Sequence, residues 1–226
     1  MPSTTIYSST EDCHISQTST NSWAQTRGNG NSTGGSRSAN HTSYDWSVYA
    51  IYSGGRGSNT FVNRRSFFDF DLSSLSIGTV TSATLSISSK NFGDTLDYDE
   101  VIAVATRDWD EDGTDYAKVF TSGTGTTFVD TYSSAVSFDN TSYAYETITL
   151  NATAISDINS KVGSGTFYLA LIGKYLDYDN NTPTLNGDYT QVGMEFKDNS
   201  SSSVHPKLEL TYTVDSVDSI LFGTNF

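Results

Sequence analysis

Short runs in which apolar and polar residues alternate recur along this chain, and they limit its fold more than any other feature. In the run 64–72, Phe68, Phe70 and Leu72 share one face. Successive side chains of a strand point to opposite faces, so such a run predicts a half-buried β-strand. Further runs that predict strands are 4–8, 13–17, 48–52, 84–88, 147–150, 192–196 and 207–212, with a weaker one at 128–132.

Two runs are apolar on both faces, and one segment has helical spacing. The runs 101–105 and 167–172 predict central strands that are covered on both sides. Asn151 is a suitable N-cap for a short helix that ends at Gly163. About ten strands and one short helix predict an all-β, antiparallel β-sandwich of the jelly-roll type.

The domain plan follows from length and loop composition. The 226 residues fit one all-β domain, which we place at 1–213, followed by a C-terminal tail at 214–226. Long loops rich in Gly, Ser, Asn, Asp and Thr are expected at 18–45, 108–127 and 175–191. Long loops inside a compact domain are often functional, so these three are the first places to look for a site.

The charge of the chain excludes several classes of partner. Only 17% of residues are charged, yet the net charge is −14, so the chain should repel nucleic acid and anionic membranes. No segment is apolar enough to insert into a membrane, and the single Cys13 allows no internal disulfide. The first residues lack the features of a secretory signal peptide, which argues against export by the usual route. A viral particle protein is made inside its host without such a signal and is released by lysis, so we expect a location on a virion surface or outside the cell.

One segment resembles a known family. The sequence Arg65-Ser-Phe-Phe-Asp-Phe-Asp-Leu-Ser-Ser-Leu75, followed by the alternating run 78–87, resembles the central pattern of the DNRLRE family. Weaker similarity continues through Trp109 and Glu111 to the run 206–212. The resemblance implies a jelly-roll sandwich similar to carbohydrate-binding modules, with no shared catalytic residues.

An acidic motif in the second long loop is the candidate metal site. Asp108, Asp110 and Asp112 alternate and are followed by Gly113. Three carboxylates spaced in this way can bind a hard cation such as Ca²⁺. The motif lacks the twelfth-position glutamate of an EF-hand, and the simpler interpretation is a solvated acidic turn. Further acidic loop clusters, which we expect to face solvent, are Asp94, Asp97 and Asp99, and Asp177 with Asp179.

Aromatic residues of the first and last long loops are candidate glycan-binding residues. Flat rings can stack on the apolar faces of sugar rings, and the alternative is that each ring covers an edge of the core. The candidates are Trp23, Tyr44, Trp46, Tyr175 and Tyr178.

The sequence predicts no catalytic site and therefore no enzyme. Cys13 and His14 are neighbours on a predicted strand, so their side chains point to opposite faces. Paired carboxylates for glycoside cleavage remain an open alternative in so acidic a chain.

The tail carries large apolar residues on a polar stretch, and it shapes the functional hypothesis. Ile220, Leu221, Phe222 and Phe226 either fold back onto their own sandwich or dock on a neighbouring subunit. Together with the acidic β-sandwich, the tail favours a structural protein of a phage-like virion, as a capsid decoration or an appendage (fibre) protein. Its partners would be other copies of itself or a capsid or tail protein. The alternative is a carbohydrate-binding adhesin domain that recognises cell-surface polysaccharide.

Overall fold

The computed structural model of the chain describes residues 1–19, 22–28, 35–37, 43–55, 58–94, 99–107, 113–121, 127–183 and 189–214. Within these ranges the protein is an all-β sandwich in which every strand pairing is antiparallel. The strands are β1 (Ser3–Tyr7), β2 (Cys13–Ser19), β3 (Gly35–Arg37), β4 (Ser43–Gly55), β5 (Ser58–Asp71), β6 (Val80–Asp94), β7 (Glu100–Ala105), β8 (Val136–Ser137), β9 (Ala144–Thr149), β10 (Thr166–Gly173), β11 (Tyr189–Glu195) and β12 (Lys207–Tyr212). The helical segments are α1 (Trp23–Arg27), α2 (Ala152–Lys161), the 3-10 turns η1 (Gly113–Ala117) and η3 (Ser202–Val204), and the π-helix η2 (Lys174–Tyr178).

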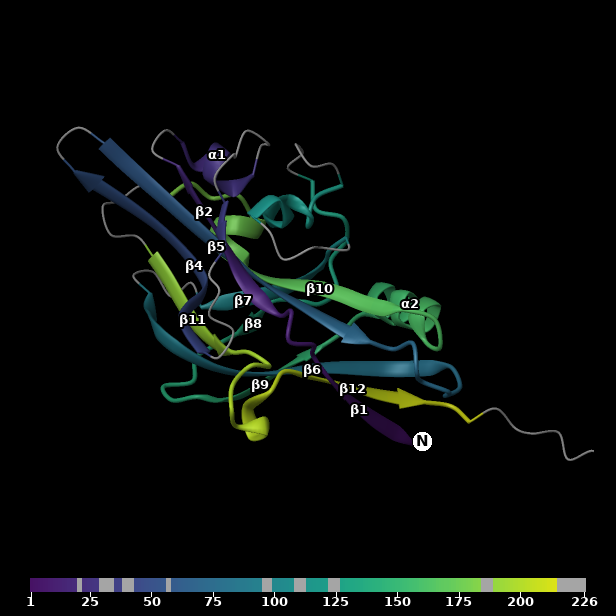
Figure 1. Cartoon of the computed structure of the whole chain (residues 1–226). Helices are drawn as coiled ribbons and strands as arrows, with labels where there is room; N and C mark the ends of the chain where they lie inside the picture. Colours follow the sequence, from purple (N-terminus) through teal and green to yellow (C-terminus); the bar gives the residue numbers. More distant parts are fainter. Residues whose placement is uncertain are drawn as a thin grey trace, which may run out of the picture.

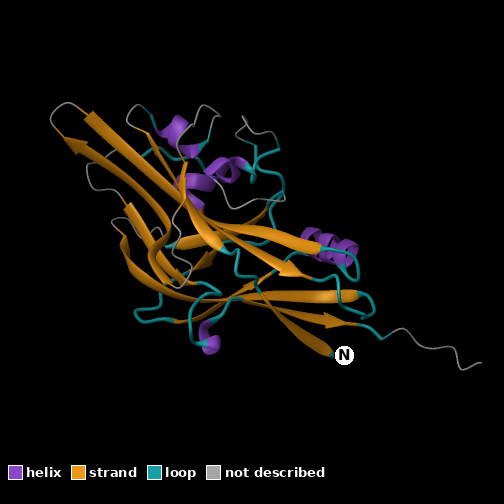
Figure 2. Ribbon diagram, in the orientation of Figure 1, coloured by secondary structure: helices purple, strands orange, loops and turns teal. Residues whose placement is uncertain are grey.

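The two layers of the sandwich are centred on the long strands β5 and β6. β5 pairs with β2, β4 and β10, whereas β6 pairs with β9, β11 and β12. β4 also pairs with β11, so the two layers form one continuous hydrogen-bonded network (Figure 1). Figure 2 shows the helical segments at the periphery of the strands.

The main core lies between the layers. One cluster of buried side chains contains Phe68 and Phe70 of β5 together with Leu85 of β6 and Leu208 of β12. The alternation predicted for these strands is therefore confirmed, because their apolar residues meet across the sandwich.

The outer face of β5, β7 and β10 is covered as well. A second cluster packs Phe67, Val104 and Ile172 against Tyr116 and Phe120. This explains why the runs 101–105 and 167–172 are apolar on both faces, and it confirms that β7 and β10 are buried on both sides. The side chains that cover this face come from η1 and the turn after it.

The predicted helix is confirmed, and its ends follow the expected capping. The Asn151 side chain accepts a hydrogen bond from the Ala154 amide at 3.1 Å, as an N-cap does. Gly163 has a φ of 71°, a value that favours glycine and ends the helix.

The loop predictions need correction. The segment 18–45 contains the end of β2, the short helix α1, β3 and the start of β4. Sequence analysis missed α1 because a five-residue helix is too short to show a periodic pattern. The residues that could have indicated it are Ser22, which caps its N-terminus, and Gly28, whose positive φ ends it. The segments 108–127 and 175–191 likewise contain η1, part of η2 and the start of β11.

A buried carboxyl group joins two turns at the edge of the sandwich. The Ser8 hydroxyl donates to Asp12 at 2.6 Å, and the Lys197 amide donates to both Asp12 oxygens at 3.1 and 3.0 Å. Burial raises the pKa of Asp12 to about 8, the two donors oppose that rise, and the charges of Asp69 and Asp198 add to it. The turn after β1 is thereby held against the residues that follow β11.

Neither α-helix of the described ranges has the length and apolar character that a membrane crossing requires.

Candidate functional site

A fully buried arginine lies below the candidate site. The guanidinium of Arg65, in the middle of β5, donates to the two carboxylate oxygens of Asp177 at 2.6 and 2.7 Å. It also donates to the carbonyl oxygens of Tyr116 and Arg27, both at 2.7 Å. Burial alone would lower the pKa of Arg65, but the Asp177 carboxylate outweighs it and the pKa is raised. Arg65 therefore connects β5 to η1, η2 and the end of α1.

A second arginine shares the same carboxylate. The Arg27 Nε, at the end of α1, donates to the Asp177 carbonyl at 2.5 Å and lies 3.7 Å from a carboxylate oxygen of the same residue. Burial lowers the pKa of Arg27, the Asp177 charge opposes this, and the nearby Arg65 adds to the lowering. Two guanidinium groups thus contact the same buried carboxylate, and removing the charge of such a carboxylate leaves buried positive charge less well compensated.

Aromatic rings lead from this buried network to the surface. The guanidinium carbon of Arg27 lies 5.2 Å from the centre of the Phe128 ring, and the ring centres of Phe128 and Tyr178 lie 5.0 Å apart in a stacked arrangement. Phe120, completely buried, lies 4.9 Å behind Phe128. Because Phe128 and Tyr178 are only half-buried, this column of rings ends in the wall of a surface hollow.

The surface hollow at the end of this column of rings is called the aromatic hollow below. It has a volume of about 420 Å³. It is lined by Arg27, Thr127, Phe128, Val129, Asp130, Thr131 and Tyr178. Arg27 is held from below by Asp177, whereas Asp130 is exposed at the rim.

A second depression, the basic hollow, adjoins the first at Val129. Its volume is about 480 Å³. The residues that characterise it are Arg107, Val129, Tyr132, Asp157, Lys161 and Tyr168. At its base the Tyr132 hydroxyl donates to the Asp157 carboxylate at 2.5 Å, and the Tyr132 ring stacks on Phe167 with centres 5.4 Å apart. Burial, together with the hydrogen bond to Asp157, raises the pKa of Tyr132, so this phenol stays protonated.

The segment 127–132 separates the two hollows and is firmly held. The Ala105 amide donates to the Asp130 carbonyl at 2.9 Å, and the Tyr132 amide donates to the Ala103 carbonyl at 2.8 Å. The side-chain amide of Asn151 also donates to the Thr131 carbonyl at 2.7 Å. This segment, the weak strand prediction, forms only isolated bridges and no regular strand.

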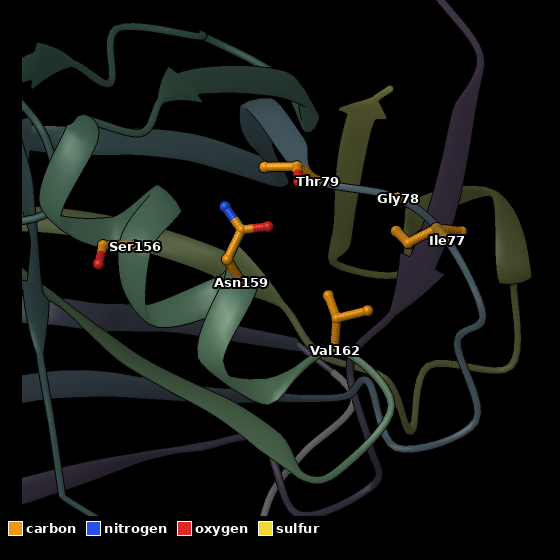
Figure 3. Close-up of a pocket in the computed structure, with 6 residues that line it drawn as sticks. All are labelled: Ile77, Gly78, Thr79, Ser156, Asn159 and Val162. Atoms are coloured by element: carbon orange, nitrogen blue, oxygen red, sulfur yellow. The ribbon is translucent and has the colours of Figure 1, made fainter. Parts of the chain in front are cut away.

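A third hollow lies on another side of α2 (Figure 3). Ile77, Gly78, Thr79, Ser156, Asn159 and Val162 line it, and its volume is about 470 Å³. Both polar atoms of the Asn159 amide are occupied, since they bond to the backbone of Val80 at 2.8 and 3.0 Å. A Cβ atom at Gly78 would lie 1.9 Å from the Thr213 carbonyl oxygen, so glycine is required there by close packing. We interpret the lining of this hollow as structural.

The predicted glycan-binding residues do not gather in one place. Trp23 is only 2% exposed and packs on Phe61, so the prediction of a sugar contact there is wrong. Tyr175 is 38% exposed, whereas Tyr178 lines the aromatic hollow. Tyr44 and Trp46 lie on β4 rather than in a loop, and their side chains are outside the described part of the structure.

The other predicted sites fall mostly outside the described residues. Asp108, Asp110 and Asp112 do so, and so do Ile220, Leu221, Phe222 and Phe226. Within the described ranges, no group of three His, Cys, Asp or Glu side chains is arranged to hold a metal ion.

Two acidic positions were expected to face solvent and do not. Asp177 and Asp99 are both buried. Asp177 is buried because it balances Arg65, which belongs to the outer face of a doubly covered strand.

Cys13 and His14 point to opposite faces of β2, as predicted. Cys13 packs in the second cluster, and the His14 ring lies 6.4 Å from Phe196 of the main core.

Sequence reasoning missed the residues that form the two adjoining hollows, except Tyr178. A weak signal exists for Arg65, which shares its strand face with Phe67, an unusual place for a charge. No local pattern indicates that Arg107, Val129 and Lys161 meet.

No protein-family model matches this chain, and no curated protein sequence matches it. The resemblance to the DNRLRE family therefore stays a prediction.

Proposed function

We propose that this protein is a non-enzymatic, polysaccharide-binding β-sandwich that holds a sugar chain along the aromatic and basic hollows. The observation that carries the proposal is that these two hollows, of about 420 and 480 Å³, meet at Val129 on a firmly held segment. Both volumes lie in the range of about 300–1,000 Å³ that is usual for ligand sites.

The lining suits a sugar chemically. A sugar ring has apolar C–H faces and a rim of hydroxyl groups, so its site needs apolar surface next to hydrogen-bonding groups. Phe128, Tyr178 and Tyr168 supply half-buried ring surface, while Asp130 and Thr131 supply polar groups beside it. Because Phe128 and Tyr178 already stack on each other, they offer ring edges and part of their faces rather than open platforms.

The test uses affinity electrophoresis through gels that contain soluble polysaccharides, both neutral and acidic. At least one polymer should retard the protein, and Asp130→Asn should weaken this binding about tenfold, the effect of losing a hydrogen bond to a charged group. Asp139→Asn changes an exposed carboxylate that lines neither hollow and should bind as the wild type does. Absence of retardation by every polymer, or full binding by Asp130→Asn, would contradict the proposal.

A second candidate function is a subunit contact in a phage-like particle, and one described surface favours it. Tyr7 and Tyr145 are exposed, and both contact His205, Tyr7 through its ring and Tyr145 through a hydrogen bond to the His205 carbonyl. Lys197 lies 4.9 Å from the centre of the Tyr7 ring, and Lys207 lies 5.0 Å from that of Tyr145. Exposed tyrosines are common at protein contacts. Light scattering of the wild type and of Tyr7→Ser/Tyr145→Ser tests this role: an oligomer lost in the variant supports it, and a monomeric wild type contradicts self-assembly.

A further inference from the structure

Two cations, Arg107 and Lys161, and one carboxylate, Asp157, line the basic hollow, and among the described residues neither cation forms an ion pair with a carboxylate. Arg107 follows β7 and Lys161 ends α2, and both side chains are exposed. Every other lysine or arginine with a described side chain contacts a carboxylate, an aromatic ring or another partner. The position of Lys161 is explained by the helix dipole, because a positive charge is favourable at a helix C-terminus, but Arg107 does not lie at a helix end. In a chain of net charge −14, a hollow whose two cations outnumber its one carboxylate favours a negatively charged occupant.

The described chain leaves the sandwich close to this hollow, on another side of α2. The Thr213 amide donates to the Thr79 carbonyl at 2.9 Å, and Thr79 lines the third hollow with Ser156 and Asn159 (Figure 3). Asp157 and Lys161 of the same helix line the basic hollow. The thickness of one helix, about 10–12 Å, therefore separates the exit of the chain from the basic hollow.

The residues that follow have the matching chemistry. The segment 215–226 contains Asp215 and Asp218, no lysine or arginine, and then the apolar run 220–222. Eight residues, 215–222, span up to about 26 Å when extended, which is enough to cross one helix. Because the segment is joined to the same chain, its effective concentration at the hollow is high.

We propose that the segment 215–226 crosses α2 and docks on the basic hollow of its own chain. Asp215 and Asp218 lie against Arg107 and Lys161, and the run 220–222 covers the apolar surface of the hollow. This docking does not depend on polysaccharide binding. If both occur, the docked segment competes with a sugar for one of the two hollows.

The test is paramagnetic NMR on the full chain. Ser219→Cys carries a nitroxide label, and the buried Cys13 is protected from labelling. We expect the label to broaden the amide signals of Arg107, Ser160 and Lys161 and to leave those of η3 unchanged. Absence of broadening around the basic hollow would overturn the proposal.

Charge reversal supplies matched controls. Arg107→Glu/Lys161→Glu should abolish the broadening, and adding Asp215→Lys/Asp218→Lys to it should restore the broadening. Lys90→Glu/Lys207→Glu reverses two cations outside the hollow and should keep it. Broadening that persists in Arg107→Glu/Lys161→Glu would overturn the proposal. So would broadening in a mixture of isotope-labelled chains with separate spin-labelled chains, because the occupant would then be a second copy.

Discussion

Removing the carboxylate shared by two buried arginines should be among the most destabilising single changes in this protein. In Asp177→Asn the side chain keeps its shape but loses its charge. The Arg65 guanidinium then loses its carboxylate bonds of 2.6 and 2.7 Å, and Arg27 loses the negative charge 3.7 Å from its Nε. Breaking a buried ion pair in this way costs about 3–5 kcal/mol. We expect a loss in that range in the free energy of unfolding.

The neighbouring Asp179 provides a matched control. Its carboxylate pairs with Lys174, but both side chains are partly exposed, so Asp179→Asn should cost about 0–1 kcal/mol. Equilibrium unfolding in urea measures both variants, with unchanged slopes as the check that the same surface is exposed. A loss in Asp177→Asn that is no larger than in Asp179→Asn would refute the argument that Asp177 neutralises buried charge.

A double variant examines the mechanism rather than the size of the effect. Arg65→Met removes one of the two cations and leaves an apolar side chain of similar length. If uncompensated charge is the cause, Arg65→Met/Asp177→Asn should be less destabilised than the sum of its single variants by at least about 1 kcal/mol. Additive losses would instead indicate that packing around Asp177, and not its charge, determines stability.

Two further predictions concern stability. Burial raises the pKa of Asp12 from its ordinary value of 3.8 to about 8, so between these values the folded state holds a proton that the unfolded state releases, and stability falls as the pH rises through this window. Asp12→Asn should therefore gain stability relative to the wild type from pH 4 to pH 8, by several kcal/mol, since one pKa unit corresponds to about 1.4 kcal/mol; a pH-independent difference in urea unfolding would contradict the burial of an ionising carboxyl. Gly78→Ala should lose about 1–3 kcal/mol because its Cβ would overlap the Thr213 carbonyl, whereas Gly165→Ala, with its nearest atom at 3.6 Å, should be near neutral in thermal melts. Equal melting temperatures for the two alanine variants would show that β12 yields at Gly78 without cost.

The sequence predicts the parts of this fold that depend on local pattern. Alternation identifies the strands that face the main core, and two-sided apolar runs identify β7 and β10. Asn151 and Gly163 mark the ends of α2 because capping is a property of a few adjacent residues.

The candidate site is less predictable because it depends on long-range packing. Arg65 and Asp177 each have an ordinary local sequence, and only the folded chain shows that they bond to each other. The aromatic candidates fail for a related reason. Trp23 lies in a Gly/Ser/Asn-rich stretch typical of a loop, yet Ser22 starts a helix there that turns the ring into the core.

The pairing of β1 with β12 has a mechanical consequence. Ser3 lies opposite Thr211, and Tyr7 lies opposite Lys207, so the two strands run antiparallel side by side. Anything attached before residue 3 and after residue 212 would emerge at the same end of this pair. Tension between two such attachments would open the ladder one hydrogen bond at a time, beginning at Ser3, instead of loading all the bonds together. This edge of the sandwich would therefore peel under a small pulling force while the core between the layers is still packed.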